Sequence, residues 1–172
     1  MSQQLSAYQE HMLEVWQRHA YGEFIAQDPD IAIGTMGPDP YILAVPFGQL
    51  LQGREEVYSF YSKDFLPKIP KDMEMEPIQT IVAERHIVDE FIVRFTHDIE
   101  MPWQIPGIQP TGKKVELVMS VIVGFDGDLI SYEHLMWDHS VLLYQIGEID
   151  HPAAAGGLAS AAHLKAMLSK RG

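Results

Sequence analysis

Apolar residues recur at steps of three and four positions over the first 24 residues, which is the spacing of one face of an α-helix. That face is formed by Leu5, Tyr8, Met12, Val15, Trp16, His19, Ala20 and Phe24. Asp28-Pro29-Asp30 is expected to end the helix. A second helix is predicted for residues 54–66, where an apolar face lies between Gly53 and Pro67.

The rest of the chain favours strands. Short strands are expected at 31–36 and 41–45. Longer ones, rich in Val, Ile and Phe, are expected at 76–84, 87–97, 114–125 and 129–138. Asp126-Gly127-Asp128 predicts a tight hairpin turn between the last two, and residues 98–113 read as a loop. Helices followed by antiparallel strands predict an α+β fold.

The strand at 114–125 is apolar on both faces, whereas a strand with one wet face should alternate cleanly. The sheet is therefore expected to be covered on both sides, by its own helices and by a second subunit, in a two-fold homodimer. Residues 1–150 are interpreted as the main domain. Residues 151–172 are interpreted as a C-terminal tail with a short helix from about residue 158 to 170.

The balance of charges limits the partners. The chain has 172 residues, a formal charge of −12 and no cysteine. An acidic surface repels phosphate backbones and anionic lipid, so neither nucleic acid nor a membrane is expected as partner. No secretory signal opens the chain and no apolar run reaches the roughly 20 residues of a membrane span. A cytoplasmic location is expected.

Ionisable residues among apolar ones are the main chemical signal. Alternation along 129–138 puts Tyr132, His134, Met136 and Asp138 on one face, with Glu133 and Trp137 on the other. His97 ends an earlier strand, and His19 lies on the apolar face of the first helix. A carboxylate and a histidine beside an apolar cavity can perform general acid–base chemistry, because desolvation brings carboxylate pKa values toward neutrality.

Each candidate also has a purely structural interpretation. Asp138 could cap the turn that follows it, and His134 could be a hydrogen-bonded core histidine. His19 could serve packing, and His97 could anchor the long loop. Adjacent strand residues such as Glu133 and His134 point to opposite faces, so the sequence predicts no metal site. A phosphate-binding glycine loop and a nucleophile elbow are both missing.

Five short motifs, in order, resemble the SnoaL-like polyketide cyclase branch of the nuclear-transport-factor-2-like superfamily. They are Thr96-His97, the stretch 106–115 (PGIQPTGKKV), the stretch 125–130 (FDGDLI), Trp137-Asp138 and Gln145-Ile146-Gly147. The resemblance implies a curved antiparallel sheet that helices wrap into a cone with an interior pocket, dimerising through the outer face of the sheet. It also implies acid–base catalysis without a cofactor, and Asp138 and His97 match its motif positions best. A related branch, the limonene epoxide hydrolases, uses an asparagine, and this chain has none.

These observations favour a cofactor-independent enzyme acting on a medium-sized, apolar carbonyl compound, as a cyclase, isomerase or lyase. Asp138 is the expected acid or base, oriented or assisted by His134 and His97. Ester or lactone hydrolysis in the same pocket is the alternative reaction, and non-catalytic binding of a small ligand is the alternative of another class. The residues expected to bind the ligand are Trp16, His19, Tyr61, Trp103, Ile105, Tyr132 and Met136.

Overall fold

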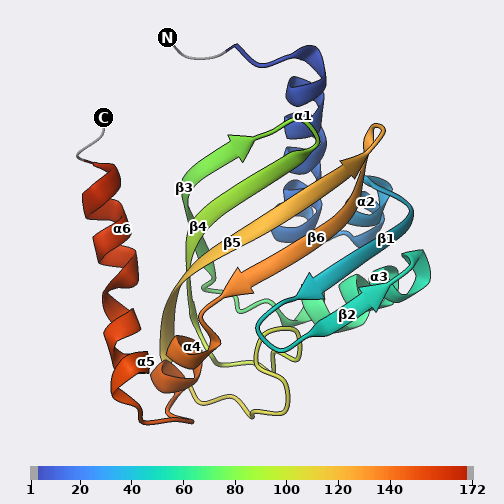
Figure 1. The fold of residues 1–172 in the computed structure, drawn as a ribbon. Coiled ribbons are helices and arrows are strands. Elements are labelled where there is room, and N and C mark those ends of the chain that lie inside the picture. Colours follow the sequence, from blue (N-terminus) through green and yellow to red (C-terminus); the bar gives the residue numbers. More distant parts are fainter. Residues whose placement is uncertain (1–3, 170–172) are drawn as a thin grey trace.

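A six-stranded sheet forms the centre of the molecule, with its strands in the order β2-β1-β6-β5-β4-β3 (Figure 1). The computed structural model describes residues 4–169. The strands are β1 (Met36–Ala44), β2 (Gln49–Gln52), β3 (Glu74–Val82), β4 (His86–Thr96), β5 (Lys114–Asp126) and β6 (Leu129–Trp137). Neighbouring strands are antiparallel except β1 and β6, which are parallel. The predicted α+β class is confirmed.

The N-terminal helices cover one face of this sheet (Figure 1). They are α1 (Ala7–Tyr21), α2 (Pro29–Gly34) and α3 (Arg54–Phe60). One π-helical turn (Gly22–Ala26) extends α1 and another (Tyr61–Phe65) extends α3. The start of α1 is fixed by a capping box, in which Ser6 and Gln9 bond each other's backbone N–H.

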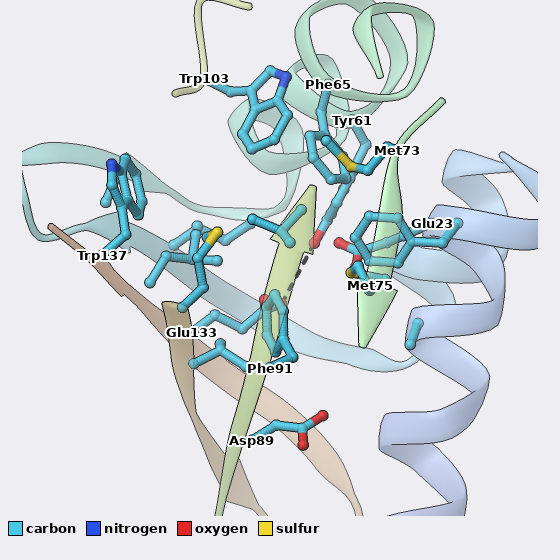
Figure 2. Close-up of a pocket in the computed structure, with 18 of the residues that line it drawn as sticks. Glu23, Tyr61, Phe65, Met73, Met75, Asp89, Phe91, Trp103, Glu133 and Trp137 are labelled. Atoms are coloured by element: carbon cyan, nitrogen blue, oxygen red, sulfur yellow. Dashed lines mark hydrogen bonds between the residues drawn. The ribbon is translucent and has the colours of Figure 1, made fainter. Parts of the chain in front are cut away.

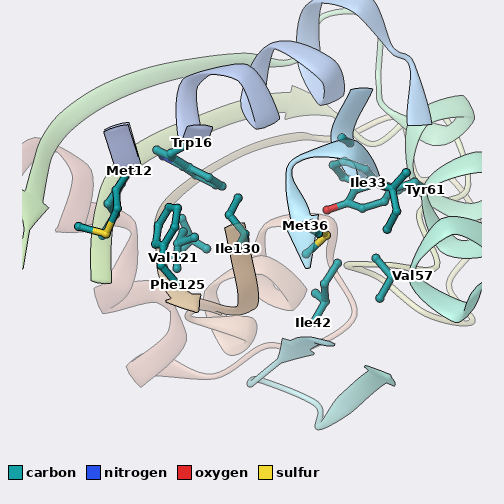
Figure 3. Close-up of a cluster of buried hydrophobic side chains, with 14 of the residues drawn as sticks. Met12, Trp16, Ile33, Met36, Ile42, Val57, Tyr61, Val121, Phe125 and Ile130 are labelled. Carbon is teal, nitrogen blue, oxygen red and sulfur yellow. The ribbon is translucent and has the colours of Figure 1, made fainter. Parts of the chain in front are cut away.

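The main core lies between α1 and the sheet. Figure 3 shows Met12 and Trp16 of α1 pointing toward Val121, Phe125 and Ile130 of the sheet. Fully burying one such side chain contributes roughly 1.5–3 kcal/mol. Apart from Glu133, this face of β5 and β6 is apolar, and its contacts hold α1 against the inner face of the sheet. That contact sets where the residues at the end of α1 lie.

The outer face of the sheet is partly covered by the end of the chain itself. After β6 follow α4 (His139–Ile146), α5 (Pro152–Gly156) and α6 (Ser160–Leu168). Lys165 of α6 forms an ion pair with Glu76 of β3, and Glu76 forms a second ion pair with Arg94 of β4. Glu76 and Arg94 therefore lie on the outer face of the sheet. In Figure 1, α6 runs alongside the sheet, away from α2 and α3. The second apolar face of β5 thus has a partial intramolecular cover, formed by α4 and α6.

Four elements differ from the sequence expectations. Residues 31–36, predicted as a strand, belong mainly to helix α2, because Asp28 caps the N–H of Asp30 and Pro29 occupies the first helical position. Strand β2 and the helices α4 and α5 were not predicted. β2 is only four residues long, and α4 begins directly at Asp138, where the strand pattern ends. Among residues 4–169, no helix has the length and apolarity needed to cross a membrane.

Candidate active site

An apolar cavity of about 270 Å³ lies between the inner face of the sheet and the helices. Its walls are mainly aromatic, aliphatic and methionine side chains, and all three tryptophans of the chain line it. Figure 2 shows residues from the helices, from β3 and β4 and from β6 facing the same space. A cavity of roughly 150 Å³ holds one benzene ring, so this one suits a ligand of about two rings.

The polar end of the cavity is built by Glu23, Tyr61 and Glu133, with His19 directly behind them. The Nε2 atom of His19 lies 3.1 Å from a Glu133 oxygen, 3.2 Å from a Glu23 oxygen and 3.0 Å from the Tyr61 hydroxyl. The Tyr61 hydroxyl also donates to Glu133 at 3.4 Å, the bond drawn in Figure 2. None of the four side chains is more than about a tenth exposed, so water screens these contacts little.

Local backbone structure explains how these groups meet. His19 and Glu23 are four residues apart, so they share one helix face. Glu23 lies in the first π-helical turn and Tyr61 begins the second, and π-turns are frequent at functional sites. A Cβ atom on Gly22 would come within 2.8 Å of the Ala32 nitrogen, so the missing side chain lets α2 approach α1 closely. Glu133 reaches the cluster from β6.

The other ring nitrogen of His19 is held by α2. Its Nδ1 atom lies 2.7 Å from the Thr35 hydroxyl oxygen and 3.1 Å from the Ala32 carbonyl. The Thr35 hydroxyl itself donates to that carbonyl at 2.6 Å, so its oxygen is left to accept from the histidine. Nδ1 therefore carries a proton, and Nε2 is the nitrogen that faces the carboxylates.

The electrostatics of the cluster favour a protonated histidine. Burial alone would lower the pKa of His19, but Glu23 and Glu133 outweigh it and raise that pKa to about 10. Burial raises the pKa of Glu23, against the lowering effect of His19. Burial and the two carboxylates raise the pKa of Tyr61 further above its usual value. At neutral pH the cluster combines an imidazolium, two carboxyl groups and a neutral phenol.

The same side chains are the ones that could hold a metal ion. One nitrogen of His19 and one oxygen each of Glu23 and Glu133 lie within 4.8 Å of one another, and a histidine with carboxylates is a common ligand set for zinc. Their contacts of 3.1–3.2 Å are also ordinary charge-assisted hydrogen bonds. These three side chains therefore satisfy one another's hydrogen-bonding groups without a bound ion.

Four of the residues predicted from the sequence lie at this site. Trp16, Tyr61 and Trp103 line the cavity, and His19 forms the cluster behind its polar end. Trp16 stacks on the His19 ring with centroids 5.5 Å apart. Trp103 packs its ring edge-on against Phe65, with centroids 4.9 Å apart.

Asp138, the predicted acid or base, lies outside the cavity at the start of α4. One of its oxygens accepts hydrogen bonds from the backbone N–H groups of Ser140 (3.0 Å) and Val141 (3.2 Å). The Ser140 hydroxyl also donates to it and lowers its pKa. These are the partners and the pKa direction that the capping interpretation requires, and the side chain is exposed.

His134, Tyr132 and Met136 share a face of β6, as the alternation predicts, but the cavity lies on the opposite face. That face carries Glu133, Leu135 and Trp137. On the outer face, His134 Nε2 lies 2.9 Å from the Tyr41 hydroxyl, and its ring stacks on Tyr132 with centroids 4.6 Å apart.

His97 and Ile105 are both fully buried, yet neither lines the cavity. His97 lies under the loop that follows β4, where its Nδ1 atom is 3.2 Å from the Thr111 hydroxyl. Burial lowers its pKa, which favours a neutral ring. Ile105 packs in a second cluster of buried apolar side chains, which includes Val141 and Leu142 of α4.

Three carboxylates of the cavity were not among the predicted site residues: Glu23, Asp89 and Glu133. Two signals in the sequence could have pointed to them. Glu23 follows His19 by one helical turn on the apolar face, and Glu133 alternates with Leu135 and Trp137. Asp89 falls near the start of a strand, where nothing in the pattern of neighbouring residues distinguishes the two faces.

Comparison with known proteins supports the fold. No protein-family model matches the chain, and no curated protein matches it in sequence. A structure from Jannaschia sp. CCS1, named for its likeness to SnoaL-like polyketide cyclases, superposes with a TM-score of 0.71 over 87% of this chain and 100% of its own, at 15% identity.

Two further solved structures show the same arrangement. A protein from Catenulispora acidiphila DSM 44928 with a ketosteroid isomerase-like fold, in complex with trimethylamine, gives a TM-score of 0.59 over 78% of this chain and 92% of its own, at 16% identity. A nuclear-transport-factor-2-like protein of unknown function from Burkholderia pseudomallei K96243 gives 0.60 over 80% and 98%, also at 16% identity. The chain has the nuclear-transport-factor-2-like fold that the motif resemblance predicts.

Proposed function

We propose that the protein is an acid–base enzyme that moves a proton next to the carbonyl group of a two-ring, largely apolar compound. The observation that carries the proposal is the cluster of His19, Glu23, Tyr61 and Glu133 at one end of an otherwise apolar cavity. Ionisable groups with displaced pKa values in a cavity are typical of catalytic sites.

Glu133 is the proposed base. An imidazolium 3.1 Å away stabilises a negative charge on its carboxylate, and its position among apolar walls deprives that charge of water. One Glu133 oxygen would accept the proton from the carbon beside the carbonyl group. His19 keeps its own proton throughout, because its pKa of about 10 is far above neutrality.

Glu23 and Tyr61 are the proposed donors to the substrate's carbonyl oxygen. The raised pKa of Glu23 favours a protonated carboxyl group, and Tyr61 is a neutral phenol at any physiological pH. Both can donate a hydrogen bond to the negative charge that develops on the oxygen as Glu133 removes the proton. Returning the proton to a different atom completes an isomerisation. In a cyclisation, the enolate carbon attacks a second carbonyl carbon of the same molecule, whose C=O π electrons move to its oxygen, and that oxygen takes up the proton held by Glu133.

The test uses 1-tetralone, a two-ring ketone, in D2O. Proton NMR would follow the exchange of the hydrogens beside its carbonyl group, with the protein present and absent. Glu133→Gln should slow the protein-catalysed exchange by about 10²–10⁴-fold, the usual contribution of a general base. The matched control is Glu90→Gln, which removes one carboxylate from the outer face of β4 and should leave the exchange unchanged.

Two results would contradict the proposal. If Glu133→Gln exchanges 1-tetralone as fast as the unmodified protein, Glu133 is not the base. If the unmodified protein binds 1-tetralone without accelerating exchange, the cavity serves non-catalytic binding. Hydrolysis of a two-ring lactone that depends on Glu133 would instead support the alternative reaction, in which the same carboxylate activates water.

A further inference from the structure

Charge is distributed unevenly along the walls of the cavity. Among residues 4–169, three carboxylates line it, those of Glu23, Asp89 and Glu133, and no lysine or arginine does. His19 offsets the charge of the first cluster, because it lies 3.1–3.2 Å from Glu23 and Glu133. Asp89 stands apart from that cluster, on β4, which is separated from β6 by β5.

Asp89 is a carboxylate held only by neutral groups. One of its oxygens accepts the indole N–H of Trp16 at 3.0 Å, and the other accepts the Thr80 hydroxyl at 2.8 Å. Within the part of the chain that the structure describes, no lysine, arginine or histidine nitrogen pairs with it. Both oxygens keep a free lone pair, since a carboxylate accepts up to about four hydrogen bonds.

Two aromatic residues of the cavity wall lie near this carboxylate. Phe91 follows two positions along β4 and also lines the cavity. Trp16 donates its N–H to Asp89, and one face of its ring stacks on His19. Aromatic faces carry negative partial charge and attract cations, most of all where water is excluded. Asp89 and these rings together form a setting that favours a positive charge.

Asp89 is partly buried, and a ligand that fills the cavity removes water from its cavity side. A neutral apolar ligand leaves the free lone pairs on that side without a partner, which is unfavourable. An anion adds repulsion. A protonated nitrogen replaces the lost water with a charge-assisted hydrogen bond and with contacts to the aromatic faces.

We propose that the natural ligand carries a protonated amine that pairs with Asp89. The amine half of this inference is independent of catalysis. The statement that the same molecule presents a carbonyl group to Glu133 rests on the proposed function. Asp89 lies opposite Val121 of β5, which lies opposite Leu135 of β6, so Glu133 is offset by two residues along β6. With strands about 4.8 Å apart and a rise of about 3.4 Å per residue, the backbones of Asp89 and Glu133 are separated by about 12 Å. A two-ring skeleton with the amine and the carbonyl at opposite ends matches that separation.

The experiment compares three molecules that share one skeleton and differ in charge. They are 1-aminotetralin, which is cationic at pH 7, neutral 1-tetralone and anionic tetralin-1-carboxylate. Quenching of tryptophan fluorescence gives each dissociation constant, since all three tryptophans line the cavity. The amine should bind roughly tenfold more tightly than the ketone, as expected for a cation in a desolvated aromatic site, and the carboxylate should bind most weakly.

Asp89→Asn keeps the shape of the side chain and removes its charge. In this variant the amine should lose its advantage, while the affinity for 1-tetralone stays within about twofold or improves. Glu90→Gln, the neighbouring carboxylate on the outer face, is the matched control and should retain the full preference for the amine. Circular dichroism on each variant verifies that the fold is intact.

The inference is overturned if the amine and the ketone bind equally to the unmodified protein, or if Asp89→Asn retains the preference. A preference that disappears in Glu133→Gln but persists in Asp89→Asn would place the cation at the other cluster and equally overturn the assignment. The outcome is separable from the proposed function. If the unmodified protein prefers the amine but does not accelerate exchange, only the catalytic proposal is wrong. If it accelerates exchange in a Glu133-dependent way but does not prefer the amine, only the amine proposal is wrong.

Discussion

Raising the pH from 7 to 9 should destabilise the fold through one buried group, His19. Its pKa in the folded protein is about 10, whereas an unfolded histidine titrates near 6.5. A group whose pKa is raised by folding stabilises the protein fully below the unfolded value and loses that effect as the pH rises through the folded value. The contribution of His19 is therefore complete below pH 6.5 and gone above pH 10.

The size of the effect follows from linkage. Inside this window one proton changes the free energy of unfolding by about 1.4 kcal/mol per pH unit, so about 2–3 kcal/mol should be lost between pH 7 and 9. Glu23 acts in the same direction, because burial raises its pKa too. Burial lowers the pKa values of His97 and His139, so their opposite contributions are already complete by pH 6.5.

Urea unfolding at pH 7, 8 and 9, at constant ionic strength, measures this loss directly. His19→Gln should remove most of the slope and leave only the smaller contribution of Glu23. Glu133→Gln should reduce it, because only Glu23 then remains to raise the pKa of the histidine. NMR of the His19 ring in the folded protein provides a second measurement, in which the imidazolium should persist beyond pH 9. A free energy of unfolding that stays constant from pH 7 to 9, together with a neutral ring at pH 8, would refute the electrostatic argument.

Four other outcomes can be checked. Asp138→Ala should cost about 1 kcal/mol of stability, the usual loss of a helix cap, with turnover unchanged; a loss of 10²–10⁴-fold in turnover would instead restore its predicted catalytic role. Trp103→Ala should weaken binding of two-ring ligands more than it lowers the melting temperature, whereas the reverse order would indicate a packing role. Dialysis against EDTA should leave exchange activity intact, and recovery of lost activity with zinc would assign His19, Glu23 and Glu133 to a metal site. Light scattering at micromolar concentration should give a dimer, because Tyr41, Tyr132 and Met136 on the outer face are only partly covered; a monomer would show that α6 suffices as the cover.

The periodicity of apolar residues predicted the architecture well, because each helix or strand needs apolar residues on the face that it buries. The apolar face at 5–24 leads to α1, and four long runs rich in Val, Ile and Phe become β3 to β6 with ends displaced by about two residues or fewer. Residues 31–36 were assigned wrongly because a short apolar run suits a buried strand and a buried helix alike. There the N-cap formed by Asp28 and the proline at the first helical position favour a helix.

The site was harder to predict than the fold because the choice of face on β6 is a tertiary property. Alternation separates His134 from Glu133 but does not say which of them meets the helices. Histidine and aspartate are the residue types usually expected to do acid–base work, and that expectation favoured the face of His134. The structure puts a glutamate inside because the opposite face, with Leu135 and Trp137, completes the apolar wall.

Stability alone does not explain the buried cluster. Two carboxyl groups and a histidine removed from water cost several kcal/mol in desolvation, and their mutual attraction roughly offsets that cost; apolar residues of similar volume would often do as well or better. A cluster kept only for stability could lie anywhere in the core. This one lies at the end of a cavity, with Thr35 orienting His19 from behind and Glu23, Tyr61 and Glu133 facing the empty space. That arrangement costs stability at high pH and leaves the polar groups where a ligand would reach them.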